Sequence, residues 1–181
     1  MLRVGSEVLE RLEKKLGYQF KDQNLLRQAI SHRSVGSCHY ERLEFLGDSI
    51  LGFIIAEELY RRFPAASEGQ MSRLRSHLVK GKTLAKLAVQ ITLGDFLLLG
   101  SGELKSGGFR RESILADAFE AIIAGIYIES GIEVCRQCIQ HLYGDLLSNA
   151  DPSELSKDSK TALQELLQSL NLALPEYQTL Q

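Results

Sequence analysis

The segment ERLEFLGDSIL, residues 41–51, carries the strongest structural signal in this 181-residue chain. Its acidic residues Glu41, Glu44 and Asp48 fall at i, i+3 and i+7, a spacing that places them on one face of an α-helix. Apolar side chains occupy the rest of the circumference: Leu43, Phe45, Leu46, Ile50, Leu51, Phe53, Ile54 and Ile55. Because a helix that is apolar almost all round is typically a central element, we predict a long buried helix over residues 40–63.

A second segment, ILADAFEAII at residues 114–123, repeats the pattern with Asp117 and Glu120 at i, i+3. Buried carboxylates are costly unless cations balance them, and Arg42 is the only basic residue close in sequence to the first acidic group. Hard divalent ions such as Mg²⁺ or Mn²⁺ suit an oxygen-only ligand set. The chain offers no Glu-x-x-His pair for a di-iron site, and the lack of nitrogen and sulfur ligands argues against zinc. The competing interpretation is a structural network of ion pairs.

Helix geometry ranks the candidate ligands. At a rise of about 1.5 Å per residue, Glu44 and Asp48 are about 6 Å apart along the axis, and Glu41 and Asp48 about 10.5 Å. The ions of a two-metal site are only about 4 Å apart. We therefore expect Glu44 and Asp48, facing Asp117 and Glu120, to close around the metal, with Glu41 at the periphery.

Composition places the chain among ordinary folded proteins. It is 44% hydrophobic and 24% charged, which excludes disordered, collagen-like and low-complexity chains. It contains no apolar run long enough for a transmembrane helix and no signal-peptide block near its start. The three cysteines are too few for a disulfide scaffold, and Cys135 and Cys138 are interpreted as ordinary cysteines. These features favour a cytoplasmic protein.

Charge is distributed unevenly along the chain. The net charge is −2, but residues 71–111 hold eight basic against two acidic residues, whereas residues 112–155 hold one basic against eight acidic residues. Neighbouring blocks of opposite sign suggest a polyanion held near a site that is itself acidic. Such a site accepts a polyanion only when cations neutralise it, which again favours a divalent metal.

The hydrophobic pattern predicts an all-α fold. Helices are expected at residues 8–16, 22–30, 40–63, 67–78, 84–91, 111–130 and 132–147. Asp22 is placed to cap the second helix, and Ser67 with Gln70 forms a capping-box pattern. Glycines at residues 100–108 predict a flexible loop, and the apolar run 96–99 is compatible with strand or helix.

Several segments together resemble the bacterial ribonuclease III family. Besides residues 41–49, they are HRS (32–34), EGQMS (68–72), GELKSGG (102–108) and RRESILAD (110–117). The resemblance covers residues 1–148 and implies an all-helical endonuclease domain that acts as a homodimer on double-stranded RNA. It further implies Mg²⁺ dependence, with Mn²⁺ as a substitute, and products with 5′-phosphate, 3′-hydroxyl and short 3′ overhangs. Ribosomal RNA precursors and other structured transcripts are the implied substrates. A catalytically inactive relative that only binds double-stranded RNA remains the alternative.

The resemblance also implies residue roles. Glu44, Asp117 and Glu120 match metal ligands, and Asp48 and Glu120 match catalytic carboxylates. The roles of four further positions rest on weaker matches: Glu41 and Glu68 (outer acidic residues), Phe45 (a contact to the partner subunit, or else a core residue) and Tyr40 (an asparagine in most of the family). Lys105, Arg110 and Arg111 are candidate RNA contacts on the glycine-rich loop.

The end of the chain departs from a complete ribonuclease III. We interpret residues 149–156 as a linker. Residues 157–181 resemble the start of a double-stranded-RNA-binding domain, which spans about 65–70 residues in the family. A single helix and the entry to one strand bury too little surface to fold alone. We therefore expect residues 157–181 to be mobile or to dock opportunistically, in a truncated protein or a fragment.

Overall fold

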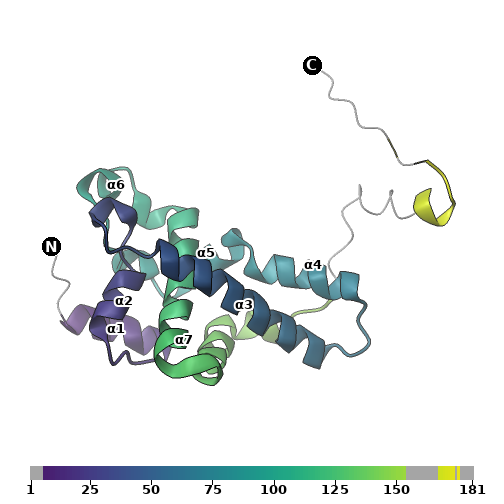
Figure 1. Cartoon of the computed structure of the whole chain (residues 1–181), viewed down its shortest axis with the longest axis horizontal. Helices are drawn as coiled ribbons and strands as arrows, with labels where there is room; N and C mark the ends of the chain where they lie inside the picture. Colours follow the sequence, from purple (N-terminus) through teal and green to yellow (C-terminus); the bar gives the residue numbers. More distant parts are fainter. Residues whose placement is uncertain (1–5, 154–166, 174, 176–181) are drawn as a thin grey trace, which may run out of the picture.

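The computed structural model describes residues 6–153, 167–173 and 175 of the chain. Figure 1 shows an assembly of helices. The α-helices are α1 (Ser6–Leu16), α2 (Gln23–Ala29), α3 (Glu41–Arg62), α4 (Glu68–Val79), α5 (Gly81–Gln90), α6 (Ser101–Lys105), α7 (Glu112–Tyr143) and α8 (Asp145–Ser148). The 3-10 helices are η1 (Arg33–Val35), η2 (Leu93–Asp95) and η3 (Gly108–Arg110). The all-α prediction is confirmed for the described residues.

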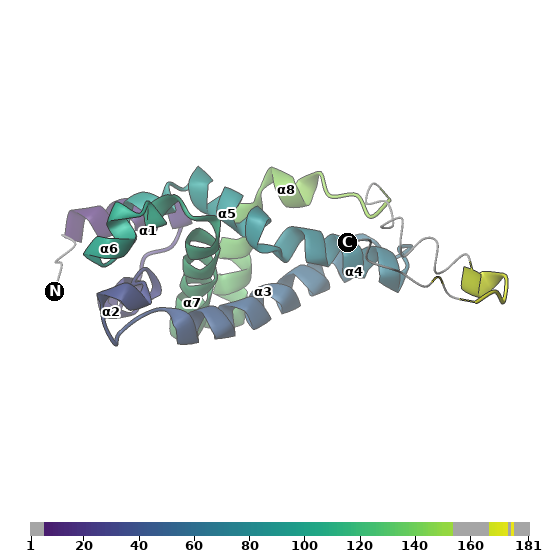
Figure 2. The ribbon, with the colours of Figure 1, turned by 90° about the horizontal axis from the view of Figure 1, so that it is seen from above.

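Two long helices, α3 and α7, form the centre of the fold. They make the most extensive helix contact, α5 packs on α7, and α4 packs on α3. Figures 1 and 2 show α3 and α4 extending together beyond α7, at the end opposite to α1, α2 and α6. The core contains buried side chains from both central helices, including Leu51, Ile55, Phe119 and Ile122. The contact between α3 and α7 therefore brings the two acidic segments of the sequence together.

Local sequence signals set the helix ends as predicted. The Asp22 side chain accepts a hydrogen bond of 2.9 Å from the Asn24 amide and caps α2. Ser67 and Gln70 form the reciprocal capping box that starts α4. The predicted break after residue 130 is present as Gly131, whose φ of 75° interrupts α7. A left-handed conformation of this kind suits glycine because a Cβ would be strained there.

The predicted flexible loop at residues 100–108 is wrong, because these residues form α6 and lead into η3. The Gly100 amide donates a 2.8 Å hydrogen bond to Ser34 Oγ, and a Cβ on Gly100 would lie 2.5 Å from the Ser34 carbonyl oxygen. An ion pair of 2.6 Å between Glu103 and Arg111 ties α6 to the start of α7. At Gly100, therefore, glycine permits close packing. The ambiguous segment 96–99 contributes one isolated β-bridge, from Leu98 to Ser31.

Helix α3 is not buried all round, contrary to the prediction. Phe45, Phe53 and Tyr60 are 79%, 56% and 72% exposed, and they lie along one side of the helix. The physical reason is that α7 and α4 cover the other sides and no described element covers this one. The interpretation of Phe45 as a core residue is therefore wrong.

Most of the predicted second domain, residues 157–181, lies outside the described residues. Only residues 167–173 and 175 of it are described, so the expectation for that segment stays a prediction. None of the described helices is both long and apolar enough to cross a membrane.

Candidate active site

Three carboxylates from the two central helices converge. Glu44 of α3 and Asp117 and Glu120 of α7 each offer an oxygen atom, and these atoms lie within 4.8 Å of one another. The i, i+3 spacing puts Asp117 and Glu120 on the same face of α7, which packs on the face of α3 that carries Glu44. All three side chains are half-buried. The sequence predicts these three residues together with Asp48, from their helical spacing and the cost of burying carboxylates.

The electrostatics of this cluster are unfavourable without a cation. Among the described residues, no basic side chain forms an ion pair with Glu44, Asp117 or Glu120. Burial raises the pKa of Glu120 to about 8, and the charges of Asp48, Asp117 and Glu44 add to this shift. Burial and neighbouring acids also raise the pKa of Glu44, and burial raises that of Asp117 although the nearby His32 acts in the opposite direction. Half-buried, mutually repelling oxygen donors at this spacing fit a hard divalent ion.

Asp48 lies at the edge of the cluster. It is exposed and follows Glu44 by one helical turn, and it is not part of the group within 4.8 Å. Its charge nevertheless raises the pKa of both Glu44 and Glu120, so it lies close to their carboxylates. The structure therefore places three of the four predicted inner acids together and the fourth on their solvent side.

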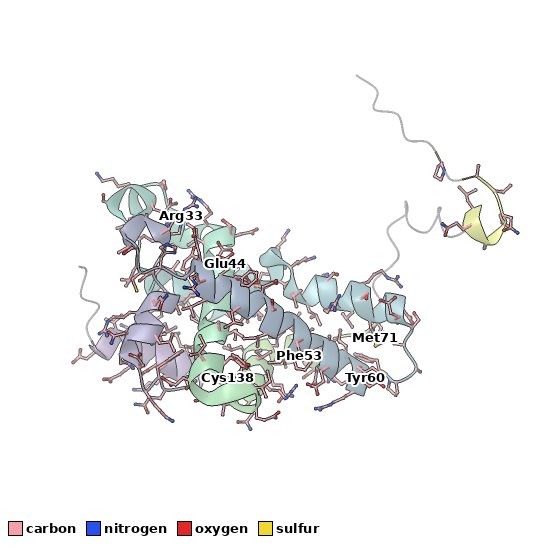
Figure 3. The ribbon with its side chains drawn as sticks, viewed as in Figure 1. Arg33, Glu44, Phe53, Tyr60, Met71 and Cys138 are labelled. Carbon is pink, nitrogen blue, oxygen red and sulfur yellow. The ribbon has the colours of Figure 1, made fainter. Side chains whose placement is uncertain are left out.

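The two outer acids occupy different places. Glu41 is peripheral, as expected, with its carboxylate 3.5 Å from the Arg33 guanidinium and 3.7 Å from His39. Glu68 starts α4 and accepts a 2.6 Å hydrogen bond from Ser72 Oγ. It lines a groove beside Phe53 and Tyr60, at the far end of α3 from Glu44 (Figure 3). Within one chain, Glu68 does not join the acidic cluster.

A polar cavity of about 620 Å³ opens onto the cluster. Its lining includes Glu44 and Asp117 of the cluster, and two arginines, Arg33 from η1 and Arg111 before α7. The Arg33 guanidinium is paired with Glu41 and that of Arg111 with Glu103. Carboxylates beside guanidinium groups in one cavity can hold a metal ion and a phosphate ester side by side.

Among the predicted RNA contacts, Arg111 lines this cavity, whereas Lys105 and Arg110 are exposed and outside its lining. The Arg110 guanidinium lies over the Phe109 ring at 5.0 Å from its centroid. Their roles toward RNA stay predictions. Cys135 and Cys138 are free and buried, as ordinary core cysteines would be.

Two residues of the site were missed by sequence reasoning. Arg33, rather than Arg42, forms an ion pair with Glu41 at the start of α3. No local sequence pattern predicts this pair, because the two residues are eight positions apart. Gly47 lies between Glu44 and Asp48, where it permits close approach of α7. The sequence could have predicted the role of Gly47, because a glycine inside a strongly helical segment is unfavourable and indicates a packing requirement.

Comparisons with known proteins identify the family to which the chain belongs. A Ribonuclease-III-like family model matches residues 22–146. Ribonuclease 3 of Legionella pneumophila (strain Lens) is 58% identical over 169 residues, which cover 93% of this chain and 75% of the relative. The solved nuclease domain of ribonuclease III from Campylobacter jejuni, which has a region involved in dimer formation, is 43% identical with a TM-score of 0.74, covering 76% of this chain and 96% of that one.

A more distant similarity points the same way. The structure of Dicer from Pichia stipitis is 28% identical with a TM-score of 0.60, covering 83% of this chain and 68% of that one. The matched family region, residues 22–146, includes all the carboxylates of the cluster. The chain belongs to the ribonuclease III family of endoribonucleases.

Proposed function

We propose that this chain hydrolyses phosphodiester bonds of double-stranded RNA, with Mg²⁺ held by Glu44, Asp117 and Glu120 and Mn²⁺ able to replace it. The observation that carries the proposal is the convergence of these three carboxylates within 4.8 Å without a basic partner among the described residues. Burial first, and neighbouring acids second, raise the pKa values of these carboxylates, so a divalent ion would stabilise their charged forms. An ion pair network, the competing interpretation, would require basic side chains at these acids.

Each group around the cavity has a role in the proposed hydrolysis. The bound ion supplies charge balance on the phosphate and a lowered pKa for coordinated water. Asp48, exposed beside the cluster, accepts a hydrogen bond from the attacking water and orients it. Water attacks the phosphorus atom and the bond to the 3′-oxygen breaks. The attacking water loses a proton to solvent and the leaving 3′-oxygen takes one from solvent, so the products are a 5′-phosphate and a 3′-hydroxyl.

Arginines at the cavity support binding of the RNA backbone. Arg33 and Arg111 line the cavity beside the acids, where guanidinium groups suit phosphate oxygens. Contacts of this kind follow the A-form shape of a duplex and carry little sequence information. Membership of the ribonuclease III family, and not this geometry, implies structured cytoplasmic transcripts, including ribosomal RNA precursors, as the natural substrate class.

The exposed side of α3 supports a homodimer. Phe45, Phe53 and Tyr60 present a large apolar surface, and a groove of about 370 Å³ lies beside Phe53, Tyr60 and Met71 (Figure 3). Exposed aromatic side chains in a row are typical of an interface. In the dimer, Phe45 of one protomer inserts into the groove of its partner, and short 3′ overhangs result because two sites cut opposite strands.

The proposed dimer also accounts for the position of Glu68. Glu68 lines the groove that receives Phe45, and Phe45 follows Glu44 directly in the sequence. Insertion of Phe45 therefore brings Glu68 of one protomer toward the acidic cluster of the other. Glu68 then acts as an outer acid across the subunit boundary, as Glu41 does within one chain.

A cleavage assay on a long RNA duplex tests the proposal. The wild-type chain is expected to cut the duplex with Mg²⁺, to spare single strands, and to lose activity in EDTA. Glu120→Gln is expected to stay folded and lose cleavage, whereas Glu7→Gln, an exposed acid on α1, keeps it. Binding without cleavage by the wild-type chain at low salt would establish the inactive-relative alternative instead.

A further inference from the structure

Tyr40 lies at the base of the acidic site. It is 1% exposed and precedes the first residue of α3. Its amide donates a 2.9 Å hydrogen bond to the Ser31 carbonyl, and its own carbonyl accepts one of 2.9 Å from the Glu44 amide. The ring packs edge-on against His32, with centroids 5.9 Å apart. These contacts fix the backbone and the ring, so the position of the hydroxyl is set by the fold.

The hydroxyl of Tyr40 has no hydrogen-bond partner among the described residues although it is buried. A buried hydroxyl without a partner costs about 1–3 kcal/mol, so such groups are rare unless they have a function. Tyr40 lines the 620 Å³ cavity together with Glu44 and Asp117. Burial raises the pKa of Tyr40, and the charges of Asp117, Glu44 and Glu41 raise it further against an opposing effect of Arg33.

A protonated phenol among carboxylates can serve only as a donor to them or to what they hold. In metal sites, groups behind the ligands donate hydrogen bonds that fix ligand orientation and tune affinity. Two other tyrosines near acidic residues already use their hydroxyls: Tyr143, which is equally buried, donates a 3.1 Å hydrogen bond to the Leu78 carbonyl, and Tyr18 donates one of 2.5 Å to Glu129. Tyr40 differs from both because its hydroxyl has no partner among the described residues, and it lines the same cavity as Glu44 and Asp117.

We propose that Tyr40 is a positioning residue of the metal site, whose hydroxyl donates a hydrogen bond to the oxygen ligands that Glu44 and Asp117 provide when a divalent ion is bound. This inference rests on the proposed metal-dependent function. Since the hydroxyl has no hydrogen-bond partner among the described residues, its contribution arises on metal binding. Removing it weakens the binding of the metal and leaves the metal-free fold intact.

Tyr40→Phe tests the proposal because it deletes only the hydroxyl. Two readouts are measured without RNA: the Kd for Mn²⁺ by calorimetry, and the thermal unfolding midpoint in EDTA. We expect the Kd to rise about tenfold, the lower end of effects from groups behind the ligands, while the midpoint in EDTA stays equal or rises. Tyr18→Phe is the matched control, expected to lower the midpoint and leave the Kd unchanged.

The possible outcomes distinguish a failure of the role proposed for Tyr40 from a failure of the proposed metal-dependent function. An unchanged Kd in Tyr40→Phe, beside a wild-type chain that binds Mn²⁺, overturns the role of Tyr40 and leaves the proposed function standing. A lowered midpoint in EDTA with an unchanged Kd shows a purely structural role and overturns it as well. A wild-type chain that binds no Mn²⁺ overturns the metal site itself and this inference with it. Glu120→Gln, measured in parallel, shows whether the observed ion occupies the acidic cluster.

Discussion

Gly47 on α3 and Glu120 on α7 meet backbone to backbone: a Cβ atom on Gly47 would lie 1.9 Å from the Glu120 carbonyl oxygen. That separation is far below van der Waals contact, so only glycine allows the two helices to cross this closely. The crossing point lies inside the acidic site, because Gly47 falls between Glu44 and Asp48 on α3. The glycine thus sets how near the carboxylates of the two helices come.

Gly47→Ala is therefore expected to damage stability and catalysis together. The obstructing atom is backbone, which cannot move aside as a side chain does, so the cost is at least about 2 kcal/mol. For a chain of this length, that lowers the unfolding midpoint by roughly 4–8 °C. Cleavage should fall further than stability explains, since the carboxylates move apart. The control is Gly102→Ala in α6, where a Cβ meets nothing within 4 Å and the midpoint should barely change.

The metal-free protein should lose stability as the pH rises. The pKa of Glu120 in the folded chain is about 8, above its ordinary value of 4.5, so folding favours the protonated form. This group is therefore least destabilising below about pH 4.5 and becomes increasingly destabilising toward pH 8. Glu120→Gln removes the charge, so in EDTA its advantage in unfolding free energy over wild type should grow across this range. If the difference in unfolding free energy between Glu120→Gln and wild type is the same at pH 5 and pH 8, the charged Glu120 carboxylate does not destabilise the fold.

Local signals explain why most of the fold could be predicted. The Asp22 cap, the Ser67–Gln70 capping box and the break at Gly131 each depend on a few neighbouring residues. The acidic cluster could also be predicted, because i, i+3 spacing fixes a helix face and burying carboxylates is costly. Once both segments are helical and apolar, packing of their apolar sides brings the acids close together despite their mutual repulsion.

Other features depend on contacts that a sequence pattern does not contain. Glycines at residues 100–108 indicated flexibility, whereas Gly100 lies there for close packing against Ser34. The apolar pattern of α3 does not distinguish a side covered by the same chain from one left exposed, which is why it predicts a helix buried all round although Phe45 and Phe53 are exposed. Likewise, the pairs that Arg33 and Arg111 form with acids join residues that no helical repeat relates.

Arg111 is expected to contribute to RNA binding through charge. Its guanidinium lines the cavity beside Asp117, so Arg111→Ala should weaken duplex binding about three- to tenfold and flatten the dependence of log affinity on log salt by about one unit. Binding is measured by filter retention in the Glu120→Gln background, which keeps the RNA intact. Lys15→Ala, an exposed charge on α1, is the control and should leave the salt dependence unchanged. Equal slopes for Arg111→Ala and its parent would remove Arg111 from the RNA contacts.

Phe45→Ala separates the dimer from the fold. The Phe45 side chain is 79% exposed in the single chain, so its removal costs the protomer little packing, and far-UV circular dichroism should be unchanged. If Phe45 fills the groove beside Phe53 and Tyr60 of the partner subunit, its loss should shift the chain from dimer to monomer in sedimentation velocity. Leu104→Ala, an exposed apolar residue on α6, is the control and should remain dimeric. Cleavage should fall with the dimer fraction and recover at high protein concentration, because each protomer keeps its own Glu44, Asp117 and Glu120. A variant that remains fully dimeric would place the subunit contact elsewhere on the molecule.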